Sequence, residues 1–588
     1  MSRTSWRTHR CGALRAPQVG ERVRLGGWVH RRRDLGGIVF LDLRDRDGIV
    51  QVAVGPGWAG RDVLERAGSL GAETVVVVEG QVVARPAEMR NRDLATGDIE
   101  VHATALDVVG PAETPAIPVA RGKGEELPSE ELRLKHRHLD LRRPELQANL
   151  MLRHRLMQRA RRTLSDLEFL EIETPILTKP TPEGARDYLV PSRVHAGEFY
   201  ALPQSPQIYK QLLMVAGLDR YFQIARCFRD EDLRNDRQPE FTQIDLEASF
   251  AGVDDVVAWV EAVLVALWDE AGHTIPHPFP RMPHGEAMER YGSDKPDLRY
   301  DLTIADWTAQ VRPLGVPFFQ AAAADSARVR GLAVPGGGAL SRKDVDQLAE
   351  AVKQLGATGL AWVKRQGEQL TGSVAKYFTA DALGRLGVGD GDAALIAVGP
   401  DRVTSPVLDR VRQEVVRRLA LPSRTAHAFV WIVDFPLFEP DPASGVPVFA
   451  HHPFTAPHAD DLERIESDPF ACRALHYDAV YNGNELGSGS IRITDPAVQR
   501  RIFARLGLPP AEIDARFGFL LRGLAGGAPP HGGFAIGLDR VAMLLTGATS
   551  LRDVMAFPKT AGARALFEGA PIPVRSEDLA ALHLRVTS

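Results

Sequence analysis

Short alternating segments of apolar and polar residues fill the first part of the chain. Five of them, separated by glycine-containing turns, lie at residues 23–30, 38–43, 49–54, 74–83 and 99–109. A period of two is typical of β-strands that are half buried. Five short strands in so small a stretch predict a closed barrel, and the OB-fold is the commonest barrel of this size.

The pattern changes after the predicted barrel. Residues 110–127 are rich in Pro, Ala and Glu and predict a linker. Apolar residues then recur at helical intervals over 146–167, which predicts an amphipathic helix, and FLEIETP at 169–175 predicts a strand that ends at a proline. From about 292 to 424 aromatic residues are few and Ala, Gly and Val are many, which indicates an inserted α+β domain.

Composition narrows the class of protein. A chain of 588 residues is too long for one hydrophobic core, and 44% hydrophobic with 25% charged residues is ordinary for a soluble globular protein. The net charge of -5 excludes a basic surface throughout, so any contact with nucleic acid depends on local patches.

Cysteine usage and hydropathy indicate the compartment. Cys11, Cys227 and Cys472 have neither metal-ligand nor disulfide-framework spacing, which suits a reducing interior. No apolar run follows the N-terminal arginines as in a signal peptide, and none is long enough to span a bilayer. We expect a cytoplasmic protein that does not associate with membranes.

The densest group of charged side chains lies at residues 228–245, FRDEDLRNDRQPEFTQID, between two strand-like runs. This pattern predicts a hairpin with a charged loop. Arginine forks match phosphate and carboxylate oxygens, and acids accept hydrogen bonds from amines, so the loop suits a ligand that combines a triphosphate, an adenine and an amino acid. A solvated, ion-paired hairpin is the alternative on this segment alone.

The first hairpin of the predicted barrel carries a second group of candidate ligand-binding residues. Arg33 follows two further arginines, Phe40 lies on the next strand, and Gln51 lies on the strand after it. Basic side chains bind phosphate, aromatic rings stack on bases, and amides read base edges. A solvated arginine cluster beside a core phenylalanine explains the same residues in an isolated barrel.

Three segments together resemble the signature motifs of the class II aminoacyl-tRNA synthetases. They are the helix with FLEIETP, the arginine hairpin at 228–245, and GGFAIGLDR at 532–540. Nearly the whole chain is similar to the bacterial-type aspartyl-tRNA synthetase family. The resemblance implies an α+β multidomain fold with an N-terminal OB barrel, a class II catalytic domain built on a mostly antiparallel sheet, and an inserted domain similar to a GAD domain.

The resemblance also implies the domain boundaries. We expect an anticodon-binding domain at 1–110, a linker at 111–135, a catalytic domain in two parts at 136–291 and 425–560, the GAD-like insertion at 292–424, and a C-terminal extension at 561–588. The family is homodimeric, with the first motif at the dimer seam.

The activity implied is that of an aspartate–tRNA ligase. ATP would activate L-aspartate as aspartyl-adenylate, with release of diphosphate, and the aspartyl group would pass to the 3′ end of tRNA(Asp). Neither a protein nucleophile nor a general base is needed for the first step. Catalysis would come from positioning and from neutralisation of phosphate charge by Mg²⁺ and by the two catalytic arginines, Arg229 and Arg540.

Aspartate-binding residues follow from the resemblance. Lys210 and Arg492 would pair with the side-chain carboxylate of the substrate, whereas a surface lysine and a strand-edge ion pair are the ordinary alternatives. The lid at 181–187 would bring Glu183 to the substrate amine. The full expected set is Glu183, Ser205, Gln207, Lys210, Arg229, Asp245, His451 and Arg492.

ATP-binding residues follow in the same way. Phe241 and Arg540 would cover the two faces of the adenine, and Glu231 would accept from its amino group. Asp478 and Glu485 are expected near the same end of a strand or turn as Mg²⁺ ligands, with two solvated acids as the alternative. The expected ATP set is Arg229, Asp230, Glu231, Gln238, Phe241, Glu485, Gly537, Leu538, Asp539 and Arg540.

Selection of tRNA is the finer question. Arg33, Phe40 and Gln51 would read the anticodon. Family members that also charge asparagine tRNA often carry His and Gly where this chain has Leu35 and Glu88, so we expect discrimination against tRNA(Asn). Two other interpretations stay open: an asparaginyl or lysyl relative of the same layout, and an RNA-binding paralogue without activity.

Overall fold

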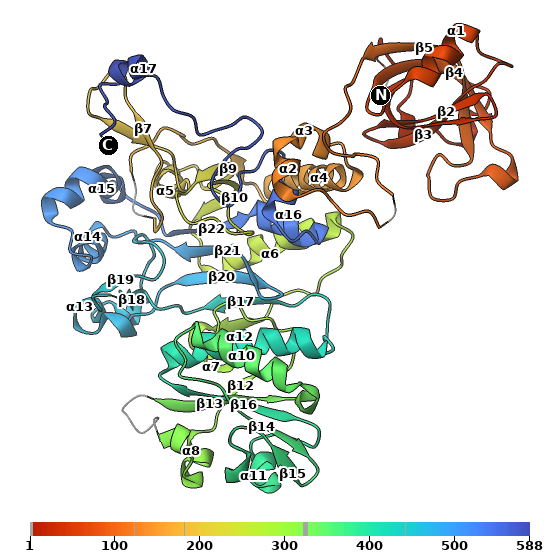
Figure 1. Cartoon of the computed structure of the whole chain (residues 1–588). Coiled ribbons are helices and arrows are strands. Elements are labelled where there is room, and N and C mark those ends of the chain that lie inside the picture. The colour runs from red at the N-terminus through yellow and green to blue at the C-terminus, as the bar shows by residue number, and fades with distance from the viewer. Residues whose placement is uncertain (1–3, 123, 181–182, 321–326, 442, 588) are drawn as a thin grey trace.

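The computed structural model describes residues 4–122, 124–180, 183–320, 327–441 and 443–587. Figure 1 shows three regions: a barrel at the N-terminus, a large central sheet with its helices, and a smaller sheet formed by the middle of the chain. Within the described residues, no helix combines the length and the apolar character that a membrane crossing needs.

The N-terminal region is the expected barrel. Five strands close in the order β1-β2-β3-β5-β4, and the pairs are antiparallel except for β3 with β5. In β1, buried residues alternate with partly exposed ones, as the sequence pattern predicts. The strands are β1 (Arg22–Leu35), β2 (Ile38–Asp45), β3 (Gly48–Val54), β4 (Val75–Ala84) and β5 (Ile99–Gly110), and α1 (Arg61–Ser69) lies between β3 and β4.

Three helices join the barrel to the rest of the molecule. They are α2 (Glu130–Lys135), α3 (Arg137–Asp140) and the long α4 (Pro144–Asp166). Helix α2 therefore occupies the last residues of the segment expected as a linker. Arg142, between α3 and α4, pairs with buried Glu73 of the barrel at 2.9 Å and lies over the ring of Trp28. These contacts attach the barrel to the start of α4.

An eight-stranded sheet forms the centre of the molecule, in the order β11-β17-β20-β21-β22-β10-β9-β6. Only the two edge pairs, β11 with β17 and β6 with β9, are parallel. The strands are β6 (Leu170–Glu171), β9 (Arg220–Phe228), β10 (Glu240–Ser249), β11 (Arg281–Pro283), β17 (Phe429–Val433), β20 (His476–Tyr481), β21 (Asn484–Ile491) and β22 (His531–Gly537).

Helices cover one face of this sheet. Apolar side chains of α4, α6 (Val253–Glu270) and α16 (Leu538–Thr546) form one core with Ile244 and Leu246 of β10 and with Phe534 and Ile536 of β22. The residues of β10 between these positions point to the other face. That second face is therefore left for polar side chains.

Further elements surround the second face. Helices α5 (Gln207–Val215) and α15 (Pro510–Ala525) share a small apolar core. The remaining elements of this region are the ribbons β7 (Leu189–Pro191) with β8 (Phe199–Ala201) and β18 (Phe438–Pro440) with β19 (Pro447–Phe449), and the helices α13 (Arg464–Ser467), α14 (Pro496–Arg505) and α17 (Ser576–Ala581).

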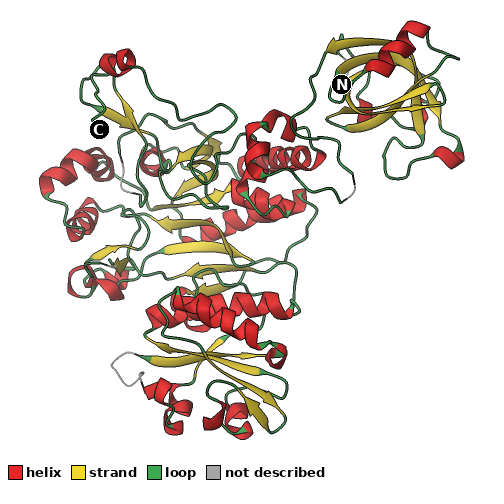
Figure 2. Cartoon of the chain, viewed as in Figure 1, coloured by secondary structure: helices red, strands yellow, loops and turns green. Residues whose placement is uncertain are grey.

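The middle of the chain forms an antiparallel sheet in the order β12-β13-β16-β14-β15, with α10 and α12 packed on one face (Figure 2). The chain leaves the central sheet after β11 and returns to it at β17, the strand that pairs with β11. The strands are β12 (Ile304–Asp306), β13 (Arg328–Val334), β14 (Ala361–Gln366), β15 (Gln369–Thr371) and β16 (Ala393–Gly399). The helices are α7 (His284–Tyr291), α8 (Thr308–Val311), α9 (Pro317–Gln320), α10 (Arg342–Lys353), α11 (Ala380–Arg385) and α12 (Asp401–Leu419).

Short 3₁₀ helices complete the described secondary structure. They are η1 (Cys11–Ala13), η2 (Ala16–Gln18), η3 (Ala87–Met89), η4 (Arg312–Leu314), η6 (Gly337–Ala339), η7 (Ala375–Tyr377), η8 (Ala459–Asp461), η9 (Pro469–Ala471) and η10 (Leu551–Asp553).

The packing predicts where the central sheet is most sensitive to truncation. Ile244 is fully buried at the middle of β10, between β9 and β22. Because the cavity left by Ile244→Ala cannot collapse between paired strands, we expect the free energy of unfolding to fall by about 2–5 kcal/mol in urea denaturation. Val446→Ala, at a side chain that is 54% exposed, is the matched control and should change it by less than about 0.5 kcal/mol. Equal effects of the two changes would contradict this packing.

Candidate functional site

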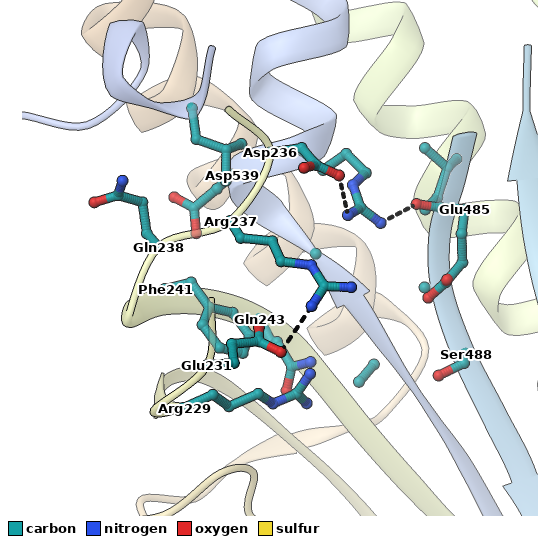
Figure 3. Close-up of a pocket in the computed structure, with 16 residues that line it drawn as sticks. Arg229, Glu231, Asp236, Arg237, Gln238, Phe241, Gln243, Glu485, Ser488 and Asp539 are labelled. Carbon is teal, nitrogen blue, oxygen red and sulfur yellow. Dashed lines mark hydrogen bonds and ion pairs between the residues drawn. The ribbon is translucent and has the colours of Figure 1, made fainter. Parts of the chain in front are cut away.

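A polar cavity of about 220 Å³ opens at the second face of the central sheet (Figure 3). The loop between β9 and β10 forms one wall, and β21, β22 and the start of α16 form the other. The lining residues are Arg229, Glu231, Asp236, Arg237, Gln238, Phe241, Gln243, Glu485, Leu486, Gly487, Ser488, Ala535, Gly537, Asp539, Arg540 and Leu551. Most of the residues expected to bind ATP are therefore brought together.

Arg229 lies at the start of the loop, where its backbone N–H donates to the carbonyl of Pro239 at 2.9 Å. Its guanidinium lies over the ring of Phe241, 4.9 Å from the centroid. Within the described residues, Arg229 has no carboxylate partner, and its buried Nε has no hydrogen-bond partner. Arg229 as a whole is half-buried, and a buried guanidinium nitrogen without a partner is costly in a folded protein unless a ligand bonds to it.

Glu231 and Arg237, two other charged residues of the loop, are paired with each other. Arg237 donates to Glu231 at 2.9 Å, as Figure 3 shows. Asp230, next to Arg229, donates its backbone N–H to the carbonyl of Arg186 and does not line the cavity. The loop thus presents Arg229 with open hydrogen-bonding capacity, while Glu231 and Arg237 hold each other.

Arg540 approaches the cavity from the side opposite the loop. Its Nη1 donates to the backbone carbonyl of Glu485 at 2.8 Å, and Nη2 lies 3.4 Å from Asp236 of the loop (Figure 3). Arg540 therefore bridges the two walls.

Several expected ATP residues are engaged elsewhere. The carboxylate of Asp539 accepts from the backbone N–H of Thr242 at 2.7 Å and pairs with Arg153. Leu538 is fully buried in the core under the sheet, and Gly537 lines the cavity without a side chain. Both ends of the Gln238 amide are bonded to the backbone of Lys559. Gly537 therefore offers only its backbone to a ligand at the cavity, and Leu538 does not line the cavity.

The expected metal ligands lie on the two strands of one hairpin rather than at one strand end. Asp478 is on β20 opposite Ser488, and Glu485 is on β21 opposite Val480, with a β-bulge between. Asp478 Oδ1 and His476 Nε2 are hydrogen-bonded at 2.8 Å. Burial raises the pKa of Asp478 well above its ordinary value.

Burial and the charge of Asp478 also raise the pKa of Glu485, to about 7. Burial disfavours ionisation of both carboxyl groups, and a bound cation would offset this cost. Their oxygens suit Mg²⁺. In the described part of the chain, no group of three or more His, Cys, Asp or Glu side chains is arranged as a metal site. The protein would therefore hold Mg²⁺ through two carboxylates only, and the substrate and water would supply the other ligands of the ion.

A second, deeper group of charges lies beside the cavity. Lys210 of α5 pairs with Asp245 at 2.5 Å and with Glu247 at 3.3 Å. Arg492 donates to both carboxylate oxygens of Glu247, at 2.8 and 3.0 Å. All four side chains are at most 3% exposed. We call Lys210, Asp245, Glu247 and Arg492 the charge quartet.

The two carboxyl groups of the charge quartet have pKa values that shift in opposite directions. Burial works against ionisation of Glu247, but the charges of Arg492 and Lys210 outweigh it and lower the pKa of this carboxyl. Burial raises the pKa of Asp245 despite Lys210. Asp245 Oδ2 has no hydrogen-bond partner within the described residues, so this oxygen remains available for a donor such as an ammonium group.

The other expected aspartate-binding residues surround the charge quartet. Ser205 donates to Glu183 at 2.5 Å, and both line a small hollow next to α5. Gln207 is buried at the start of α5. Thr181 and Pro182 of the expected lid lie outside the described residues.

The two adjacent histidines take different positions. His451 stacks on His476 with ring centroids 3.4 Å apart, and burial lowers its pKa to about 2. His452 accepts from Arg492 at 2.9 Å, so the second histidine of the pair contacts the charge quartet directly.

Sequence reasoning missed Glu247, Gln243 and Ser488. A signal for two of them was present in FTQIDLEAS, where Gln243, Asp245 and Glu247 alternate with apolar residues and so share one face of β10. Nothing in the local sequence around Ser488 distinguishes it.

The expected anticodon residues gather on one face of the barrel. Arg33 lies opposite Phe40 in the β1–β2 register and donates to Asp42 at 2.7 Å and to Gln51 at 3.2 Å. Gln51 in turn donates to Glu100 at 2.8 Å. Leu35 is 62% exposed at the end of β1, and Glu88 is exposed in η3. Asp42 and Glu100 are polar members of this face that the sequence did not single out.

Comparison with known proteins agrees with this geometry. A family model described as tRNA synthetases class II (D, K and N) matches residues 129–561, and one described as an OB-fold nucleic acid binding domain matches 23–109. The Aspartate–tRNA ligase of Geobacillus kaustophilus is 49% identical over 99% of each chain. The Aspartate–tRNA(Asp/Asn) ligase of Bacillus subtilis is 48% identical over 99% of this chain and 98% of its own length.

Solved structures show the same fold at low identity. Asparaginyl-tRNA synthetase from Pyrococcus horikoshii in complex with asparaginyl-adenylate matches with a TM-score of 0.57 and 20% identity, over 94% of this chain and 98% of that one. Aspartyl tRNA synthetase from Entamoeba histolytica matches with a TM-score of 0.55 and 19% identity, over 92% and 89%. By family model and by full-length identity, the chain belongs to the class II tRNA synthetases, in the aspartate–tRNA ligase family.

Proposed function

We propose that this chain is an aspartate–tRNA ligase that activates L-aspartate with ATP and transfers it to the 3′ end of tRNA(Asp). The observation that carries the proposal is the buried charge quartet, which shares a face of β10 with Gln243 of the polar cavity, where Arg229 has no carboxylate partner among the described residues. A small acid and a nucleotide would lie side by side there. The family membership supports the same reaction.

Aspartate would occupy the space between α5 and β10. Its ammonium would donate to the open Oδ2 of Asp245, and its side-chain carboxylate would accept from Lys210 and Arg492. Glu247 holds both cations in place and lowers the net charge around them. An asparagine amide would bring donors toward cations that need acceptors, so selection for a carboxylate follows from hydrogen bonding.

The nucleotide would occupy the larger cavity. Phe241 offers a face for the adenine ring, and Arg540 bridges the walls where the terminal phosphates would lie. Arg229, at the junction of the two ligands, would contact the α-phosphate as the aspartate carboxylate attacks it. Fixed cations that meet charge as it develops are an effective form of transition-state stabilisation.

Mg²⁺ fits this site and would be held by Asp478 and Glu485, where it would neutralise phosphate charge. The protein's own contribution is to keep both carboxylates on one rigid hairpin of the central sheet.

A homodimer is part of the proposal. Strand β6 lies at the edge of the central sheet, and exposed apolar side chains accompany it: Leu170 is 51% exposed and Leu177 is 52% exposed. Apolar residues beside an open sheet edge favour burial against another chain. The dimer seam expected at the first motif would lie here.

The cytoplasm is the proposed compartment. Cys11, Cys227 and Cys472 are all buried free thiols, which suits a reducing environment.

The first prediction concerns Arg229. We expect Arg229→Ala to reduce aspartate-dependent exchange of pyrophosphate into ATP by about a hundred- to thousandfold, because Arg229 would contact the α-phosphate where negative charge develops. Arg342→Ala, at a side chain 89% exposed on α10, is the matched control and should leave the exchange rate unchanged. Near-normal exchange in Arg229→Ala would refute the assignment of this arginine.

The second prediction concerns amino-acid selection. Arg492→Lys keeps the positive charge but loses the two parallel bonds to Glu247, so we expect the KM for aspartate to rise about tenfold or more with little change in the KM for ATP. Exchange assays with aspartate and with asparagine measure both the KM and the preference. A KM for aspartate unchanged in a folded variant would exclude Arg492 from the substrate carboxylate.

The third prediction concerns tRNA. With Leu35 exposed at the hairpin end and Glu88 on the neighbouring loop, we expect efficient charging of purified tRNA(Asp) and at least about a hundredfold lower kcat/KM on tRNA(Asn), the scale of one or two lost base contacts. Charging each tRNA separately measures this. Comparable rates on the two tRNAs would show a non-discriminating ligase.

A further inference from the structure

The loop between β9 and β10 depends for its position on a distant part of the chain. Residues 231–238 of this loop include four that line the nucleotide cavity: Glu231, Asp236, Arg237 and Gln238. Most of the loop is exposed, and its only ion pair within itself is Glu231 with Arg237. A loop of this kind needs outside contacts to hold one conformation.

Residues 550–559, which follow α16 and which we call the strap, supply these contacts. The backbone N–H of Leu551 donates to the carbonyl of Asn235 at 3.0 Å, and Arg552 Nη2 donates to Asn235 Oδ1 at 2.9 Å. The loop is thus bound at its tip through both the backbone and the side chain of one residue.

A second attachment lies at the base of the loop. Gln238 Nε2 donates to the carbonyl of Lys559 at 3.0 Å, and the backbone N–H of Lys559 donates to Gln238 Oε1 at 2.8 Å. Gln238 is 2% exposed, so both bonds are shielded from water. Lys559 also pairs with Glu240 at the start of β10.

The strap is itself firmly anchored. Arg137 of α3 donates to the backbone carbonyls of Arg552, Met555 and Ala556 at 2.5, 2.8 and 2.9 Å. Arg137 is 2% exposed, and Asp140 balances its charge at 2.7 Å. Arg552 Nε also donates to Glu130 of α2 at 2.7 Å. The strap therefore joins the loop to the helices that follow the barrel.

We propose that the strap positions the nucleotide-binding loop, and that Asn235 and Arg552 are positioning residues for ATP although neither lines the cavity. The inference rests on the proposed function of the cavity. The proposal also gives a role to the Gln238 amide, which bonds to the backbone of Lys559 and so fixes the loop. Aspartate binding should not depend on the strap, because the members of the charge quartet lie on α5, on β10 and, for Arg492, directly after β21.

The test compares two substitutions at Asn235. Asn235→Ala removes the acceptor for Arg552, and we expect the KM for ATP in pyrophosphate exchange to rise about five- to tenfold, with the KM for aspartate within twofold of wild type. Asn235→Asp keeps an acceptor oxygen and should stay close to wild type. Asp232→Ala, an exposed residue of the same loop with no contact to the strap among the described residues, is the control.

A double-mutant cycle with Arg552→Ala separates positioning from general damage. If the two residues act through one bond, the KM for ATP of the double variant should not exceed that of the worse single variant. Effects that multiply, an unchanged KM for ATP in Asn235→Ala, or equal rises for ATP and aspartate would each overturn the proposal.

Failure of the proposed function gives a different result. In that case the wild-type chain itself shows no aspartate-dependent exchange. Titration calorimetry of wild type and Asn235→Ala with a nonhydrolysable ATP analogue then tests the strap directly. Equal affinities of the two proteins would overturn its role, and weaker binding by the variant would support it.

Discussion

The pairing of two buried cations with two buried carboxylates is the constraint on which the site depends. Transfer of an ion from water into a protein interior costs several kcal/mol, so each charge of the quartet persists only because a partner offsets it. Glu247 is central, since it contacts both Lys210 and Arg492. This pairing fixes α5, β10 and the segment directly after β21 relative to one another, so the proposed aspartate site would be preorganised.

In strand β10, the residues that pack in the core and the residues that face the site lie on opposite faces of the sheet. Its residues alternate between Ile244 and Leu246, which pack under the helices, and Gln243, Asp245 and Glu247, which face the site. A rigid strand with neighbours on both sides holds side chains more precisely than a loop can. The groups that would select the amino acid are therefore on regular structure.

The cavity proposed for the nucleotide is built differently from the charge quartet. Part of its lining comes from an exposed loop, and the contacts that hold this loop come from residues near the end of the chain. The strap is in turn bonded to Arg137, close to Arg142, which contacts Glu73 of the barrel. One short segment, from α3 to the start of α4, therefore contacts both the barrel and the strap.

Local pattern was enough to predict much of the fold. Period-two segments gave the barrel strands, helical spacing at 146–167 anticipated α4 (Pro144–Asp166), and two strand-like runs around a charged loop anticipated β9 and β10. The motif strings gave the family and placed most candidate ATP residues around one cavity. These features follow from the sequence because burial periodicity and ligand chemistry are properties of short segments.

Partnerships across the sheet were decided only by the tertiary structure. Arg492 and Glu247 are 245 residues apart, and strand order alone brings them to 2.8 Å. The same holds for Gln238 and Lys559, for Asp539 and Thr242, and for the burial of Leu538 in the core. The sequence by itself determined which residue types could serve a carboxylate and a nucleotide. Their division between ligand contact and structural support came from the folded chain, because a side chain's role depends on which distant groups satisfy its charge and hydrogen bonds.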